Sequence, residues 1–461
     1  MEKLNGMHFR LSALFFFCLM AGSPILGQDA FPREEFEARR EKLFDKLGDN
    51  IGIVWGGFLP DAPVRFRQSP DLYYLCGIED PEVVLLLDGR VRKSFLFSRK
   101  PSEMEEKWEG ESIWNHSDLK GRYGIDSLID MGSIWLALSF RTMLTDTLFV
   151  PLTPVDEVHL SRFNRIYFGE RNTSHPAWFP PFWVNAANRI KEKLPSVTLQ
   201  DINPFLDSLR WIKSAYEINQ LKVAGRIGAE GVQEAVKATR PGMYEYELEA
   251  VASFHFARSG ARGRSYAPSV PSGPNLNTLL YFTNDRQMKT GDVVAMSYGC
   301  DYRYYASDIS RTWPVSGRFS EEYEKMYTCI LDVRKTLVDA MKPGMTLDSL
   351  QSLTRSIYQK HGYGDRHLTF NDNLGHYVGL STYDPGPYGP GASLQAGMVL
   401  ALEPFLDDPE RKVILRLGDT VLITEQGAEI LTGYAPVELE DLYQLIDQDA
   451  PFAGSKGGEK K

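Results

Sequence analysis

The sequence predicts two domains, an α/β domain followed by a larger domain of mixed strands and helices. The first observation is the length, because 461 residues are enough for two or three domains with cores of their own. The second is the alternation of helix-like and strand-like segments from about residue 31 to residue 205. The third is a long helical pattern that begins near residue 211, after which strands and helices alternate again. We therefore place the domains at residues 28–207 and 208–446.

The first domain begins with a helix that is followed by strands. Residues 33–47 are charged and amphipathic, which is typical of a helix with one buried face. The apolar residues 51–55 come next and predict a buried strand. Residues 83–87 and 95–97 predict further buried strands, separated by the turn residues Asp88-Gly89. This order of elements is typical of an α/β domain.

The second domain opens with a long helix. Residues 211–240 have helical periodicity, and the Pro-Gly pair at 241–242 ends the pattern. The residues that share one face of this helix are Ile212, Ile218, Leu221, Ala224 and Ile227. Strand-like and helix-like segments then alternate to about residue 446. The tail, residues 447–461, is rich in Gly and Lys, so we expect it to be disordered.

The first 27 residues have the layout of a secretory signal peptide. Lys3 and Arg10 precede an apolar run at residues 11–21, and small residues follow up to Gly27. The apolar run is about half of the roughly 20 residues that a membrane-spanning helix needs. We therefore expect cleavage near Gly27, a secreted or periplasmic mature protein, and no membrane contact after cleavage.

Charge and cysteine content exclude several classes of function. The formal net charge of -10 argues against nucleic acid and against an anionic lipid surface as the main partner, since both attract basic patches. The mature chain keeps three widely spaced cysteines, Cys76, Cys300 and Cys329, which form neither a disulfide framework nor a zinc site. We expect buried free thiols, although one disulfide among the three stays open.

Short sequence blocks in both halves resemble one protein family. In the first half they are residues 66–77, 96–100 and 106–110, and in the second half they are residues 211–217, 240–245, 307–314, 375–380, 397–399 and 403–404. Their order and spacing are similar to those of the aminopeptidase P, creatinase and prolidase family, which includes Xaa-Pro aminopeptidases. The resemblance implies an α/β N-terminal domain of the aminopeptidase P type and an α+β C-terminal domain with the pita-bread fold.

The resemblance also implies a set of metal ligands. Enzymes of this family hold two divalent ions with two Asp, one His and two Glu side chains. Three of these ligands are present as Asp308, His376 and Glu403. Ser297 stands at the position of the first Asp, however, and Gly418 stands at that of the last Glu. The remaining three side chains would hold at most one weakly bound ion, Mn²⁺ or Zn²⁺, and they could equally form a hydrogen-bonded cluster with no ion.

Asp419 and Asp301 are the two nearby carboxylates that could replace the lost ligands. Adjacent side chains of a strand point to opposite faces, so Asp419 should point away from the side of Gly418. A slip of one residue would bring Asp419 in, but it would turn every side chain of that strand to the other face. Asp301 should lie in the turn after Ser297. We therefore expect neither carboxylate to complete the site.

Three histidines that serve the family's reaction are replaced as well. By the resemblance, their positions are occupied by Leu280, Asp372 and Tyr383. In the family these histidines bind the substrate and carry protons to the leaving amine. With two metal ligands and three helper histidines missing, the resemblance implies that the peptidase activity has been lost.

Three functions remain open at this point. The first is a pseudo-peptidase whose pita-bread domain binds a peptide or protein partner. The second is a residual Xaa-Pro aminopeptidase with one ion, which removes an N-terminal residue next to proline. The third is a metal-free hydrolase like creatinase, but such an enzyme depends on the histidine that Leu280 replaces. We favour the first function, and a homodimer stays open.

Overall fold

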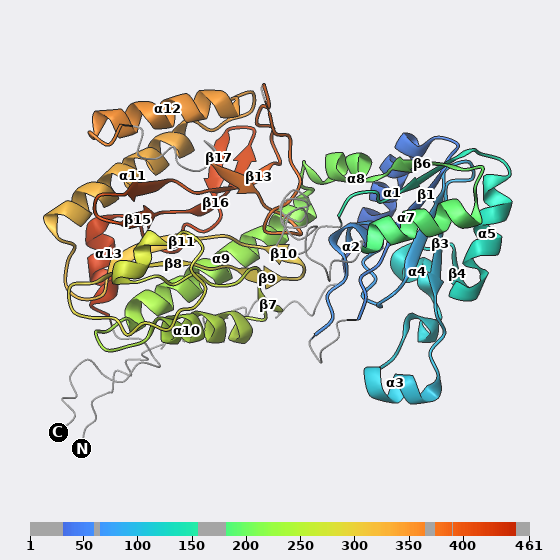
Figure 1. Cartoon of the computed structure of the whole chain (residues 1–461), viewed down its shortest axis with the longest axis horizontal. Coiled ribbons are helices and arrows are strands. Elements are labelled where there is room, and N and C mark those ends of the chain that lie inside the picture. Colours follow the sequence, from blue (N-terminus) through green and yellow to red (C-terminus); the bar gives the residue numbers. More distant parts are fainter. Residues whose placement is uncertain (1–30, 60–64, 155–180, 365–373, 390, 449–461) are drawn as a thin grey trace, which may run out of the picture.

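The computed structural model describes residues 31–59, 65–154, 181–364, 374–389 and 391–448. The predicted signal peptide, Asp372 and all but the first two residues of the predicted tail lie outside these ranges. The chain has the predicted α/β N-terminal domain and α+β C-terminal domain. Figure 1 shows the N-terminal domain on the right and the C-terminal domain on the left, with α8 (Asn203–Arg210) where they meet.

A six-stranded sheet forms the centre of the N-terminal domain. Its strands are β1 (Ile51–Trp55), β2 (Val84–Asp88), β3 (Lys93–Ser98), β4 (Ser127–Asp130), β5 (Thr147–Val150) and β6 (Thr198–Asp201). They lie in the order β4-β3-β2-β1-β5-β6. The sheet is mixed, because β1 pairs antiparallel with β2 and parallel with β5. The predicted strand at 51–55 is confirmed with the same bounds.

Most helices of this domain lie around the sheet, whereas the helix at 103–109 projects away from it (Figure 1). They are α1 (Arg33–Leu47), α2 (Pro70–Cys76), α3 (Glu103–Glu109), α4 (Leu119–Tyr123), α5 (Ile134–Thr142) and α7 (Phe182–Lys193), with short 3-10 turns η1 (Ile113–Asn115) and η2 (Met131–Ser133). The predicted helix at 33–47 is confirmed as α1. It buries Phe36, Leu43 and Leu47, as its amphipathic pattern predicts.

The C-terminal domain contains several small antiparallel sheets. The strands are β7 (Gly263–Arg264), β8 (Val293–Ser297), β9 (Cys300–Tyr302), β10 (Tyr305–Ala306), β11 (Ser310–Pro314), β12 (Gly375–Tyr377), β13 (Val399–Leu402), β14 (Phe405–Asp408), β15 (Val413–Arg416), β16 (Asp419–Thr424) and β17 (Gly427–Ile430). The largest sheet has the order β12-β13-β16-β17, and β8 pairs with β11 beside it. These two sheets carry the residues of the site described below.

The helices of this domain pack outside its strands (Figure 1). They are α9 (Ala215–Ala238), α10 (Glu245–Arg258), α11 (Glu321–Ala340), α12 (Leu347–Lys360) and α13 (Leu439–Ile446), with the 3-10 turn η3 (Gly273–Asn277). The prediction of a helix from residue 211 was wrong by one turn. Ser214 caps α9 through a capping box with Glu217, so Ile212 precedes the helix and is 41 % exposed instead of sharing its buried face.

Buried ion pairs join the two domains. Arg210, at the end of α8, donates to Asp71 of the N-terminal domain at 2.8 Å and also pairs with Asp384 of the C-terminal domain. Arg67 donates to Asp301 across the junction at 2.8 Å. The predicted boundary between residues 207 and 208 falls within α8, which is part of this junction.

The state of the cysteines and the search for membrane-spanning helices complete the description of the fold. Cys76, Cys300 and Cys329 are free and buried, which confirms the expected thiols. Their pKa values are raised to about 12, chiefly by burial, so these thiols stay protonated at neutral pH. Over the described ranges, no helix is both long and apolar enough to cross a membrane.

Candidate metal centre

Three side chains from different strand ends converge in the C-terminal domain. Asp308 lies between β10 and β11, His376 lies in the middle of β12, and Glu403 follows β13 directly. The antiparallel pairing of β12 with β13 sets His376 opposite Ala401, two residues before Glu403. One ligand atom from each of the three side chains lies within 4.8 Å of the others. The structure therefore brings together the three residues that the sequence predicts as retained ligands.

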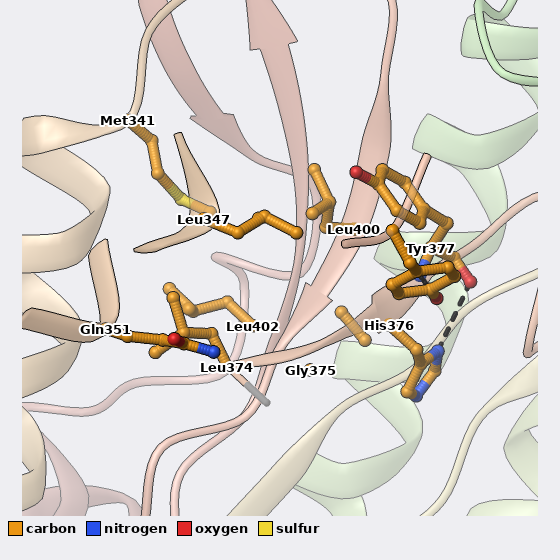
Figure 2. Close-up of a pocket in the computed structure, with 11 residues that line it drawn as sticks. Met341, Leu347, Gln351, Leu374, Gly375, His376, Tyr377, Leu400 and Leu402 are labelled. Atoms are coloured by element: carbon orange, nitrogen blue, oxygen red, sulfur yellow. Dashed lines mark hydrogen bonds between the residues drawn. The ribbon is translucent and has the colours of Figure 1, made fainter. Parts of the chain in front are cut away.

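The imidazole of His376 is oriented as a metal ligand would be. Its Nδ1 lies 3.2 Å from the carbonyl oxygen of Tyr377 (Figure 2), an acceptor, so Nδ1 carries a proton and Nε2 is the nitrogen left to face the cluster. Nε2 lies 3.2 Å from Asp308 Oδ2 and 3.7 Å from Glu403 Oε2. It is buried but has no well-aligned hydrogen bond to any residue that the structure describes. This unpartnered nitrogen fits a position that faces a cation.

The electrostatics of the cluster also favour an added positive charge. The pKa of Glu403 is raised to about 7, first by burial and then by the charge of Asp308, although its side chain keeps 30 % of its surface exposed. Burial would lower the pKa of His376, but Asp308 and the charge of Glu403 outweigh burial and raise it. The negative charge of the two carboxylates is therefore not fully balanced by the neighbouring groups.

A small apolar cavity borders β12 and includes His376 in its lining. It has a volume of about 30 Å³ and is lined by residues that include Met341, Leu347, Leu374 and Leu402. Figure 2 shows the ring of His376 turned away from these side chains. The cavity has room for about one water molecule, so it is not a site for a peptide.

The two positions that lost their ligands lie beside the cluster. Ser297, the last residue of β8, pairs with Ser310, and Gly418 forms a backbone bridge with the same Ser310. A Cβ atom at Gly418 would lie 3.4 Å from Glu403 Cγ, so its missing side chain would have pointed toward the site. Within the described ranges, no further His, Cys, Asp or Glu joins Asp308, His376 and Glu403.

Hydroxyl groups of Tyr266, Ser297 and Ser310 lie beside Asp308, near the two positions that lost their ligands. Tyr266 donates to Asp308 Oδ1 at 2.7 Å, and its oxygen lies 3.3 Å from Ser297 Oγ. Ser310 Oγ donates to Ser297 Oγ at 3.0 Å. Burial and the charge of Asp308 raise the pKa of Tyr266 well above its usual range, so this phenol remains a hydrogen-bond donor. The sequence analysis missed Tyr266, and no motif in its segment marks it.

Arg416 is the second residue that the sequence analysis missed as part of the site. Burial lowers its pKa, and the charge of Glu403 acts in the opposite direction. Its guanidinium group donates to the carbonyl oxygen of Leu279. Only its place two residues before Gly418 could have indicated a role.

Asp419 and Asp301 lie outside the cluster, as predicted. Asp419 is 1 % exposed and pairs with Arg311 at 2.8 Å and with Arg334 on the face away from the site. Asp301 accepts from Arg67 and, at 2.9 Å, from the backbone N–H of Tyr304. Both carboxylates are therefore committed to buried ion pairs.

The replaced histidine positions can be located for two of three residues. Leu280 is 62 % exposed, and the next residue, Tyr281, is anchored by a 2.8 Å hydrogen bond to Glu245. The ring of Tyr383 lies against His376, with 4.0 Å between the ring centroids. Asp372 lies outside the described residues. Neither Leu280 nor Tyr383 supplies a group that titrates near neutral pH.

Among the described residues, one group of three side chains has the composition of a divalent-ion site. One imidazole nitrogen and two carboxylates suit Mn²⁺ or Zn²⁺, and the unpartnered Nε2 of His376 is consistent with that use. At the two positions that would serve a second ion, the chain has the hydroxyl of Ser297 and the bare backbone of Gly418, so Asp308 is the one carboxylate that the described residues offer there.

Comparison with known proteins shows the family to which the chain is similar. Residues 219–425 match metallopeptidase family M24, and residues 36–145 match the aminopeptidase P N-terminal domain. The chain is 30 % identical over 453 residues to an Xaa-Pro aminopeptidase of Escherichia coli K12, covering 90 % of this chain and 98 % of the relative. It is 29 % identical, with the same coverage, to that of Haemophilus influenzae. A Bacillus anthracis structure described as an aminopeptidase P superposes with a TM-score of 0.79 at 27 % identity, covering 90 % and 98 % of the two chains.

Proposed function

The chain belongs to the aminopeptidase P family of Xaa-Pro aminopeptidases, and on that premise we propose that it is a pseudo-peptidase, which binds peptides without hydrolysing them. One observation carries the proposal. Both anionic ligands that would be specific to a second ion are absent, at Ser297 and Gly418, and the oxygen of Asp308 on that side is hydrogen-bonded to Tyr266. Among the described residues, a reaction that needs two ions would therefore find only one carboxylate, Asp308, for the second.

The two described residues at replaced histidine positions, Leu280 and Tyr383, also lack a group that would move protons near neutral pH. A leaving amine needs a proton donor whose pKa is near neutral. Leu280 has no such group, and burial raises the pKa of Tyr383 above its usual range. Peptide binding needs neither proton donor nor second ion. The exposed side chains of Leu280 and Phe282, next to the carbonyl of Leu279 that Arg416 binds, support a contact with an apolar residue of a peptide.

A residual enzyme with one ion is the second candidate, and the unpartnered Nε2 of His376 favours it. Asp308, His376 and Glu403 would hold the ion. The ion would supply a Lewis acid beside the peptide carbonyl. Glu403, whose pKa is about 7 without an ion, and His376 would then both be committed as ligands, which leaves no free base among the three residues of the cluster. We therefore expect very low turnover in this case.

Peptide binding and hydrolysis can be measured separately. The mature protein is stripped with a chelator and then titrated calorimetrically with a Leu-Pro-Leu tripeptide, with and without added Mn²⁺ or Zn²⁺. Release of free leucine is followed in the same samples. Heat of binding with no leucine released is the expected result. Release that Asp308→Ala abolishes would establish an enzyme, and neither binding nor release would contradict both candidates.

The location of the protein is a separate proposal. We infer that the leader at residues 1–27 directs export, so the mature protein is secreted or periplasmic. N-terminal sequencing of the protein recovered outside the cytoplasm should begin near Gln28. An intact Met1 on the protein from that fraction would contradict cleavage.

A further inference from the structure

Helix α5 of the N-terminal domain is apolar on both of its faces. Its inner face packs on the sheet through Leu138, which is 1 % exposed and belongs to a core shared with β1 and β5. Its outer face carries Leu136, Phe140 and, just past the end of the helix, Met143 and Leu144, which are between 62 % and 78 % exposed. A helix that is apolar all round is normally buried on every side. The outer face of α5 therefore has the composition of a contact surface.

The four exposed side chains form one continuous apolar stripe. Leu136 and Phe140 are four residues apart, as are Phe140 and Leu144, so these side chains follow one another along one side of the helix. The backbone N–H of Leu144 donates to the carbonyl oxygen of Arg141 at 3.2 Å, so the chain is still turning at the end of the stripe. Together the four side chains expose on the order of 500 Å² of apolar surface, and patches of this size on soluble proteins often mark interaction sites.

The stripe is also free of charge. Arg141 is the one charged residue at positions 131–145. Its Nε lies 3.5 Å from Asp88 Oδ2, and its guanidinium carbon lies 4.3 Å from the centre of the Phe95 ring, so this side chain is turned toward β2 and β3 of the sheet. Helices that lie on a membrane surface carry Lys and Arg on one face, and nucleic acid needs basic groups. The partner that fits this stripe is therefore an apolar protein surface of similar length.

We propose that α5 of a second copy of this chain covers the stripe, so that the protein forms a homodimer through its N-terminal domains. Two α5 helices that cross antiparallel about a two-fold axis place Leu136 of one copy near Leu144 of the other, and they bring the two Phe140 rings together at the axis. Antiparallel helices also place opposite ends of their dipoles side by side. A stable interface buries about 800 Å² on each partner, and the stripe supplies more than half of that area before its flanking residues are counted.

The proposed interface is separate from the candidate metal centre. Figure 1 shows α5 at the outer edge of the N-terminal domain, on the side away from the C-terminal domain that holds Asp308, His376 and Glu403. The dimer therefore does not depend on the proposed function. Ion binding and peptide binding should be the same in the dimer and in a variant that no longer dimerises.

A charge at the centre of the stripe tests the interface. Phe140→Glu would bury two carboxylates in an apolar contact, so the dissociation constant of the dimer should rise at least about 100-fold. Leu136→Glu, at one end of the stripe, should weaken the dimer as well. Met104→Glu is the matched control, because Met104 is 61 % exposed on α3 of the same domain and lies outside the stripe, so this variant should dimerise as the wild type does. Sedimentation velocity of the mature proteins over a dilution series gives the constants, and circular dichroism shows that each variant is folded.

A new thiol tests the geometry of the contact. Ser139 is exposed beside Phe140, whereas Cys76, Cys300 and Cys329 are buried. Ser139→Cys should therefore give a covalent dimer with a short bis-maleimide, and Met104→Cys should not.

Three other outcomes would overturn the proposal. A dimer that both Phe140→Glu and Leu136→Glu leave intact would place the contact on another surface. A wild type that is monomeric at every concentration would exclude the dimer, and protection of the thiol in Ser139→Cys from a maleimide would then show that another segment of the same chain covers α5. A monomer that floats with phospholipid vesicles, and fails to float as Phe140→Glu, would assign the stripe to a membrane surface. Leucine release from Leu-Pro-Leu, assayed separately, decides the proposed function in each case.

Discussion

Replacing Asp419 by alanine tests whether this carboxylate stabilises the fold or binds a metal ion. Asp419 is buried and accepts hydrogen bonds from Arg311 at 2.8 Å and Thr432 at 2.6 Å, and it also pairs with Arg334. Alanine would leave two buried guanidinium groups without a counter-charge. Removal of one member of a buried ion pair costs about 3–5 kcal/mol, so the free energy of unfolding should fall by at least that amount.

Urea unfolding, followed by circular dichroism, measures this loss in the Asp419→Ala variant. Asp419→Asn is the matched control, because asparagine keeps an acceptor oxygen without the charge and should recover only part of the stability. Bound ion is measured on both variants under conditions in which they are folded, and it should equal that of the wild type. A loss of bound ion with a change in stability below about 1 kcal/mol would show that Asp419 is a ligand and that the reasoning is wrong.

Two further predictions concern pH and the lost ligands. Burial alone would raise the pKa of Asp419, but the charges of Arg311 and Arg334 lower this pKa below its usual range. The carboxylate therefore stabilises the fold fully above about pH 5. This stabilisation is lost as the pH falls below about 4. The urea concentration at the midpoint of unfolding should therefore fall more steeply between pH 7 and pH 3 in the wild type than in Asp419→Asn. Parallel curves would show that Asp419 is not the source of the pH dependence. The double variant Ser297→Asp/Gly418→Glu should bind a second ion, with some loss of stability because a Cβ at Gly418 lies 3.2 Å from Ser310 Cβ. A double variant that is folded and still binds one ion would show that the ligands alone do not define the second site.

Local signals in the sequence predicted much of the fold. The helix at 33–47 and the strand at 51–55 were predicted with their observed bounds, since both have a strong apolar pattern and polar or turn residues at their ends. The long helix was predicted to start too early, because the apolar Ile212 fits the helical period. The capping box of Ser214 and Glu217, which was the better signal, sets the start.

The sequence predicted which three side chains would form the candidate metal site, and the structure places them together, but it did not predict the groups around them. Asp308, His376 and Glu403 stand in blocks that resemble the family, and alternation along a strand correctly placed Asp419 on the opposite face. Tyr266 meets Asp308 across 42 residues of sequence, through a pairing of strands and loops that no local pattern encodes. Arg416 likewise reaches the site through contacts with residues that are distant in sequence, such as Leu279.

The central claim is that the site has room for one ion at most and does not hydrolyse peptides. It is tested most directly by counting ions per chain in the mature protein after saturation with Mn²⁺ or Zn²⁺ and dialysis, with leucine release from Leu-Pro-Leu measured on the same sample. We expect no more than one ion per chain and no released leucine. Two ions per chain, with release that Asp308→Ala abolishes, would contradict it.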